Sequence, residues 1–220
     1  MPNRRPTSLA DRNQVNENHE RLVALLPADH PVAIALKGVV SPPLKSWVTL
    51  RGARLAARGN WQTGVKKVIA ADKKNDDRIR TTFRTILLKH GQEAVNDLIA
   101  RAGGNQMSDL TRMPVDRLLV VLADLFTSVD GAAEAPVYKD DLEKLRVSTS
   151  ELAAASLEES GARSQHGTAT SAEIVAEGAL DLAATRYALF VEGLYGVAEA
   201  EQYLPAIAPK RRKPSAKPAA

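Results

Sequence analysis

Helix start and stop signals recur along the whole chain, and no segment alternates apolar and polar residues with a period of two. The segments open at prolines, or at a serine or threonine that is followed three residues later by an acidic residue. They close at glycines or prolines. Between these signals the apolar positions recur every three or four residues, which is the spacing of one helix face. The sequence therefore predicts an all-α protein.

The signals also predict where each helix begins and ends. Ser8 with Asp11 reads as a helix cap, and Gly103-Gly104 and Gly131 read as helix stops. Gly59 to Gly64 reads as a loop, and Thr170 with Glu173 reads as a capping box that opens the last helix. The predicted helices are 8–26, 32–40, 42–58, 65–102, 114–130, a segment from 136 through at least 156, and 170–203.

The second half of the chain has the pattern of a helical bundle. From Tyr138 to Ser156 the apolar and small residues step by four and three, as in the seam between packed helices. We expect an up-down bundle of about four long helices, joined to a small N-terminal helical subdomain and a disordered basic tail. The predicted domains are 1–64, a basic helical subdomain; 65–204, the bundle; and 205–220, a tail rich in Lys, Arg, Pro and Ala.

Charge is distributed unevenly along the chain. Residues 30–71 contain no acidic residue and seven lysines and arginines, whereas residues 128–203 hold fourteen acidic residues and five basic ones. The formal net charge of +4 therefore hides a strong asymmetry. Such asymmetry indicates an anionic ligand at one end of the chain, or head-to-tail pairing between copies.

The predicted helix over 42–58 places an aromatic residue among guanidinium groups. Trp47, Arg51, Arg54 and Arg58 share one side of this helix. If that side is exposed, it suits phosphate contacts and stacking on a base. The alternative buries Trp47 in the core and lays the arginine side chains over it, with their charged ends in water.

Three further features bear on binding. Trp61 precedes Lys66 and Lys67, and it either contacts a ligand or plugs the end of a bundle. Near the C-terminus a four-base cluster stands between prolines, as in the basic tails of nucleic-acid-associated proteins and in nuclear localisation signals, although such tails also serve solubility. This cluster consists of Lys210, Arg211, Arg212 and Lys213.

The long predicted helix also carries a possible metal site. Asp72, Asp76 and His90 fall on one side of it, but the repeated Glu-x-x-His motif of di-metal bundles is missing. The chain has no cysteine, which excludes disulfides, thiolate metal sites and cysteine nucleophiles. No phosphate-binding glycine loop or nucleophile motif is present, so we predict no catalytic residues and no cofactor.

The leading hypothesis is a non-enzymatic helical bundle that binds an anionic partner, most plausibly nucleic acid without sequence specificity. One alternative is a protein-interaction or self-associating scaffold, in which the basic segment meets the acidic segment of a second copy or an acidic protein. The other is a metal- or ligand-binding bundle. The longest wholly apolar run, Leu118 to Ala123, is too short to span a membrane. We therefore expect a cytoplasmic protein, either free or associated with a nucleoid or nucleus.

Overall fold

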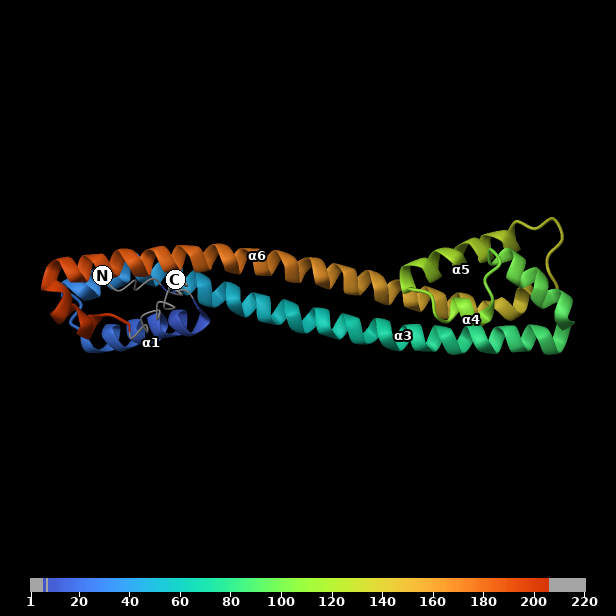
Figure 1. The fold of residues 1–220 in the computed structure, drawn as a ribbon, viewed down its shortest axis with the longest axis horizontal. Coiled ribbons are helices and arrows are strands. Elements are labelled where there is room, and N and C mark those ends of the chain that lie inside the picture. The colour runs from blue at the N-terminus through green and yellow to red at the C-terminus, as the bar shows by residue number, and fades with distance from the viewer. Residues whose placement is uncertain (1–5, 7, 206–220) are drawn as a thin grey trace, which may run out of the picture. The chain divides into compact units, whose positions relative to one another are not determined.

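The computed structural model describes residue 6 and residues 8–205, and these residues form helices and connecting turns without any strand. The all-α prediction is therefore confirmed. The predicted disordered tail lies, apart from Pro205, outside the described residues. The elements are α1 (Leu9–Leu25), α2 (Pro31–Ala35), the π-helical η1 (Leu36–Val40), α3 (Ser41–Arg101), α4 (Met107–Leu110), α5 (Val115–Asp130), the 3-10 helix η2 (Lys139–Leu142), α6 (Glu143–Ala200) and the 3-10 helix η3 (Glu201–Tyr203) (Figure 1).

Several predicted helix ends are confirmed. The backbone N–H of Asp11 donates to the Ser8 hydroxyl at 3.1 Å, and the Ser8 N–H donates to the Asp11 carboxylate at 3.0 Å, which completes a capping box. After α3, Gly103 and Gly104 take positive φ angles of 68° and 81°, which glycine adopts without steric cost. Gly131 caps α5.

The junction between α2 and α3 is continuous rather than a fresh helix start. Pro42 and Pro43 have no N–H to donate to the preceding helical turn. The backbone widens there into the π-helical turn η1, and the Ser41 hydroxyl donates to the Leu36 carbonyl oxygen at 3.2 Å. Ser41 itself has helical dihedral angles, so the chain passes through this point without a break.

The predicted end of a helix near Gly59 and the predicted loop from Gly59 to Gly64 are wrong, because α3 continues through both. Gly64 is a packing residue. A Cβ atom placed there would lie 3.1 Å from the Cα of Glu159 on α6, so glycine permits close approach of the two helices. The glycines that suggest a turn in the sequence are thus compatible with a helix whose partner comes very near. Instead, α3 departs from helical geometry at Gly91, where φ is 83°.

The predicted helix start at Thr170 is also wrong, since α6 runs unbroken from Glu143 to a kink at Gly196. The Glu173 carboxylate accepts hydrogen bonds from Arg54 of α3 and so does not act as the acid of a capping box. Because this boundary and the one at Gly59 do not exist, the expected count of about four long helices and their up-down order are not confirmed.

The described chain divides into two compact units. Among the described residues, unit 1 comprises those up to residue 56 and those from residue 167 onward, and unit 2 comprises residues 57–166, so α3 and α6 each contribute to both. In unit 1, α1, α2, η1 and the start of α3 pack with the end of α6 around a core centred on Val32, Leu36, Trp47, Leu180 and Val191. The core of unit 2 joins α3, α4, α5, η2 and α6, through Ile79, Ile86, Leu98, Leu110, Leu118, Leu122, Leu125, Tyr138, Leu142, Leu145 and Leu152.

Within unit 2, α3 and α6 run antiparallel. As the residue number rises along α3, the number of its partner on α6 falls: Lys67 lies against Glu158, and Lys74 lies against Glu151. Between the helices, Asn75 is fully buried, and its side-chain amide contacts the hydroxyls of Ser148 and Thr149 at 2.8 and 3.2 Å. A buried polar contact of this kind favours one register of a helix pair over its neighbours.

We expect the core of unit 2 to be sensitive to side-chain truncation on α5. Leu122 is fully buried, so Leu122→Ala should lower the free energy of unfolding by about 2–5 kcal/mol. Val120, two residues away, is 59% exposed, and Val120→Ala should change it by less than about 0.5 kcal/mol. Urea unfolding followed by circular dichroism measures both, and equal effects would contradict the assigned core.

Candidate anion-binding surface

Trp47 lies in the core of unit 1 and is only 2% exposed. The Arg51 guanidinium lies over its ring, 5.4 Å from the centroid, and donates to the Asn13 side-chain oxygen at 3.4 Å. This arrangement corresponds to the alternative in which Trp47 is buried and an arginine side chain covers it. The ring of Trp47 is therefore inaccessible to a base while the core is intact.

Arg54 is engaged inside unit 1. Its guanidinium pairs with the Glu173 carboxylate, whose side chain is only 7% exposed. This is an ion pair taken largely out of water, in which each charge depends on the other for stabilisation. The charge of Arg54 is therefore neutralised locally. Arg58, the last arginine of the predicted group, belongs to unit 2 and is exposed.

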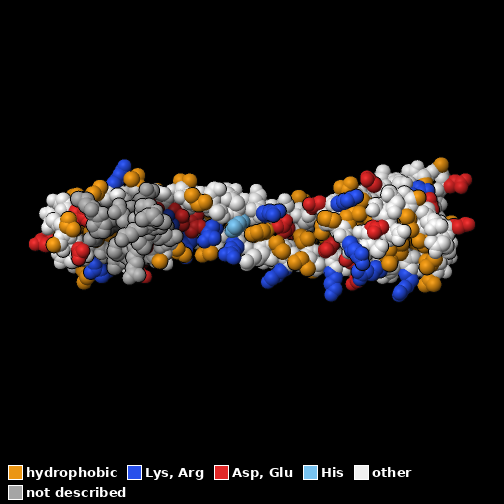
Figure 2. Space-filling view, in the orientation of Figure 1, with side chains coloured by type: hydrophobic (Ala, Val, Ile, Leu, Met, Phe, Trp, Pro, Cys, Tyr) orange, Lys and Arg blue, Asp and Glu red, His pale blue; other side chains and the backbone are white. Residues whose placement is uncertain are grey.

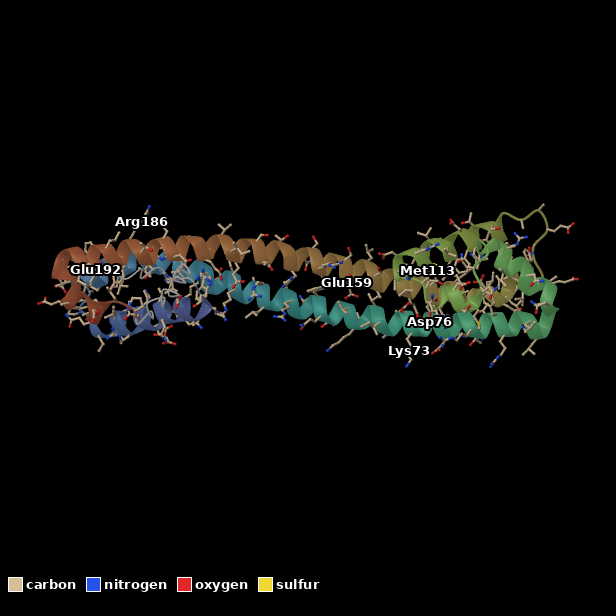
Figure 3. The ribbon with its side chains drawn as sticks, viewed as in Figure 1. Lys73, Asp76, Met113, Glu159, Arg186 and Glu192 are labelled. Carbon is tan, nitrogen blue, oxygen red and sulfur yellow. The ribbon has the colours of Figure 1, made fainter. Side chains whose placement is uncertain are left out.

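Trp61 is part of the contact between α3 and α6 in unit 2. Its indole N–H donates to the Glu159 carboxylate at 2.5 Å, and its ring stacks on His166 with centroids 5.3 Å apart. In Figure 3 Glu159 lies toward α3. Trp61 therefore holds two helices together, which is close to the interpretation of a tryptophan that plugs a bundle.

Two lysines of α3 form ion pairs across the helix contact of unit 2. Lys67 pairs with Glu158 at 2.5 Å, and Lys74 pairs with Glu151 at 2.5 Å. The lysines are seven residues apart, and so are the glutamates, which is the spacing of flanking charges in a coiled coil. We call Lys67 and Lys74 the bridging row. All four side chains are about half exposed, so these pairs contribute little to stability.

A second row of cations faces away from the helix contact. Lys66, Lys73 and Arg80 are exposed and also recur every seven residues, on the side of α3 roughly opposite Gly64 and Asn75. We call these three the outer row. In Figure 3 Lys73 points away from α6, and in Figure 2 Lys and Arg side chains gather along the edge of the molecule where this part of α3 runs. The only carboxylate paired with the outer row among the described residues is Asp77, 3.5 Å from Arg80.

A shallow hollow adjoins the outer row. It has a volume of about 370 Å³ and is lined by Lys73, Lys74, Arg78, Asp77, Ala70 and Thr81. Lys74 is already paired with Glu151, and Lys73 and Arg78 against Asp77 leave this surface weakly positive. The hollow is open to solvent, so it suits a surface phosphate rather than an enclosed small molecule.

Lys73 and Arg80 lie outside the acid-free window, and sequence reasoning did not select them. Asp72 precedes Lys73, and Asp76 and Asp77 stand between Lys73 and Arg80, so this stretch appears nearly neutral when charges are counted in blocks. The signal that identifies the outer row is its seven-residue spacing, which places its members on one helix face.

The structure does not bring Asp72, Asp76 and His90, the residues of the alternative metal-binding hypothesis, together as a metal site. The His90 ring nitrogen Nε2 lies 2.8 Å from a carboxylate oxygen of Asp141. Across the residues that the structure describes, no group of three or more potential ligands converges on a metal position. Partial burial raises the pKa of Asp72, and burial together with the charge of Asp72 raises the pKa of Asp76.

The basic cluster Lys210, Arg211, Arg212 and Lys213 lies outside the described residues. None of the described helices combines the length and the apolar character that a membrane crossing requires. Comparison with protein-family models, with curated proteins and with solved structures finds no match to this chain.

The Arg54–Glu173 pair should be more important for stability than the bridging row. Arg54→Ala leaves the Glu173 carboxylate buried without its partner, and we expect a loss of about 3–5 kcal/mol in the free energy of unfolding. Lys67→Ala, which breaks an exposed pair, should cost less than about 1 kcal/mol. Equal losses in urea unfolding would show that Glu173 is better solvated than its position indicates.

Asp72 and Asp76 should make stability depend on pH. Because their pKa values are raised in the folded state, folding opposes their ionisation, and this penalty is present above the folded pKa and vanishes as pH falls toward the unfolded value. Asp72→Asn and Asp76→Asn should therefore raise the melting temperature at pH 7, and the gain should disappear at acidic pH. Asp124→Asn, at an exposed carboxylate of α5, is the matched control. A gain that does not change with pH would contradict this account.

Proposed function

We propose that the chain binds nucleic acid without sequence specificity, through phosphate contacts made by the outer row of unit 2. The observation that carries the proposal is the repetition of exposed cations on one face of α3. Lys66, Lys73 and Arg80 form the row, and Arg58 and Arg84 are exposed cations of the same helix within the same unit. Seven residues of helix rise about 10.5 Å, so the row presents a positive charge at regular intervals along a rigid rod.

Such a row supports contact with a polyanion rather than recognition of a sequence. Lysine and arginine side chains on a helix surface bind phosphates, and these contacts position a protein on nucleic acid without reading bases. Both tryptophans of the chain are engaged inside the protein, Trp47 in the core of unit 1 and Trp61 against Glu159. Base stacking therefore has no part in the proposal, and we infer a non-enzymatic binding role.

The basic cluster at residues 210–213 is proposed as a second contact. Such a cluster, tethered to the folded body, would raise the local concentration of the protein near the polymer. The proposal implies a protein that works where nucleic acid is found, in the cytoplasm or on a nucleoid or in a nucleus. In this proposal, α3 and α6 of unit 2 form an up-down pair within a helical bundle.

Charge-driven pairing between copies is the weaker alternative. The helix α3 holds 13 lysines and arginines against 5 acidic residues, and α6 holds 9 acidic residues against 4 basic ones. Glu151 and Glu158 of α6 already pair with α3 of the same chain in unit 2, as Glu173 does in unit 1. Much of the opposite charge therefore finds its partner within the chain, and less is left for another copy.

The proposal predicts how salt affects binding. The combined change Lys66→Gln, Lys73→Gln and Arg80→Gln should weaken binding to a random DNA duplex or an RNA strand. Each phosphate contact that is lost should reduce the magnitude of the negative slope of log affinity against log salt, by about 0.9 on the duplex and by about 0.7 on the single strand. Fluorescence anisotropy at several salt concentrations measures both quantities.

A matched control removes the same charge elsewhere in unit 2. Arg112, Arg117 and Arg163 are exposed and lie outside α3, so their replacement by Gln should leave the slope nearly unchanged. If both triple variants lower the slope equally, binding depends on net charge and not on the outer row. If neither variant does, the outer row is not the binding site.

A further inference from the structure

The end of α6 in unit 1 carries a stripe of exposed apolar residues. Val175, Leu182 and Leu189 follow each other at seven-residue intervals and are 74%, 50% and 58% exposed. Ile174 and Phe190, 61% and 44% exposed, border the same stripe. In Figure 2 orange side chains lie along the edge where this part of α6 runs, and in Figure 3 Arg186 points outward from the same edge. A contiguous exposed apolar surface of this kind is typical of an interaction site.

The charges of this segment are turned away from the stripe. Arg12 of α1 pairs with Asp181 at 2.9 Å and with Glu177 at 3.2 Å, and Glu173 pairs with Arg54. Between residues 171 and 193, all of which the structure describes, the one exposed charged side chain is Arg186. The outward face is therefore almost neutral, and two such faces can meet without electrostatic repulsion.

The stripe is complementary to the same stripe of a second copy that runs in the opposite direction, with Leu182 at the common centre. An antiparallel copy centred on this residue sets Leu182 against its own counterpart. Apolar residues then face apolar ones, and a small residue faces each small or long one. The facing pairs are Val175 with Leu189, Gly178 with Arg186, and Ser171 with Gly193, while Ile174 and Phe190 flank the contact on opposite edges.

The glycines in this pattern fit it. A Cβ atom at Gly178 or at Gly193 would meet nothing within 4 Å, so neither glycine is required by packing inside the chain. In the antiparallel pair, Gly178 provides room for the long side chain of Arg186 from the other copy. The open space at these two glycines is therefore compatible with a second copy on this face.

We propose that the chain forms a two-fold symmetric dimer through this face of α6, with the two helices antiparallel and Leu182 on the axis. A side chain of this size offers on the order of 100 Å² of apolar surface, and about half of it is exposed on five residues of each copy. Pairing thus covers at most roughly 500 Å² of large apolar side chains, which is the size of a weak and transient interface. The dimer is therefore weak and reversible.

The segment beyond residue 205 is a poor alternative occupant. It contains one large apolar residue, Ile207, among prolines, alanines and bases, so it cannot cover five apolar side chains. A second copy supplies a matching stripe of the same length. The interface rests on apolar contact and is independent of the proposed binding of nucleic acid.

Single cysteines test both the symmetry and the register, because the chain has no cysteine of its own. Leu182→Cys should form a disulfide-linked dimer under mild oxidation, since the two residues meet on the axis. Val175→Cys should not link to itself, because its symmetry mate is about 21 Å away along the helix. A mixture of Val175→Cys with Leu189→Cys should form the mixed dimer. Failure at Leu182, or self-linking at Val175, would overturn the proposal.

Sedimentation velocity tests the same interface in the full chain without cross-linking. Leu182→Asp places a charge on the axis from both copies and should raise the dimer dissociation constant at least about tenfold. Leu157→Asp, at a 76% exposed position of α6 in unit 2, should leave it unchanged. Dimerisation should persist at high salt. A chain that is monomeric at every concentration, or a dimer that salt dissolves, would refute apolar self-pairing.

Discussion

Close approach of α3 and α6 at Gly64 is the contact on which the structure of unit 2 depends. The absence of a side chain at Gly64 lets the backbone of Glu159 come within van der Waals distance, and this proximity places Trp61 against Glu159 and Asn75 against Ser148 and Thr149. These contacts share one register. The bridging row then follows, because Lys67 and Lys74 meet Glu158 and Glu151 only when the helices are aligned in this way. The outer row faces solvent for the same reason.

The uneven charge of the sequence has a structural explanation as well as a functional one. Within unit 2, Lys67 and Lys74 of α3 attract Glu158 and Glu151 of α6, and like charges at these positions would repel each other. Only part of the positive charge is used in this way. The remaining cations, on the opposite face of α3, support the proposed binding of a polyanion.

Helix caps and helix stops were predictable from the sequence because their causes are local. The Ser8–Asp11 capping box involves residues three apart, and the glycines after α3 adopt dihedral angles that few other residues accept. The boundaries at Gly59 and Thr170 were not predictable in this way. The contacts that keep the helices continuous there, Gly64 with Glu159 and Arg54 with Glu173, join residues about a hundred positions apart.

The candidate surface was predictable only in part. Most of the acid-free window lies on α3. Counting charges along the sequence, however, cannot separate cations on opposite faces of one helix. It grouped Arg54, which is neutralised by Glu173, with Lys66, which faces water. Which side of α3 meets α6 is decided by the fold. Once that side is known, the seven-residue spacing distinguishes the outer row from the bridging row.

The composition of the α3–α6 contact has a consequence for how unit 2 opens. Between residues 57 and 71 of α3, Val68 and Ala71 are only partly buried, whereas farther along, before Gly91, Ile79 and Ile86 are fully buried. The helical hydrogen bonds are continuous across both stretches, but the apolar burial that protects them is not. The part of α3 before Gly91 therefore contains a stretch that separates readily from its partner and a stretch that separates only when the whole core is lost. Continuity of secondary structure and continuity of stability are different properties in this chain.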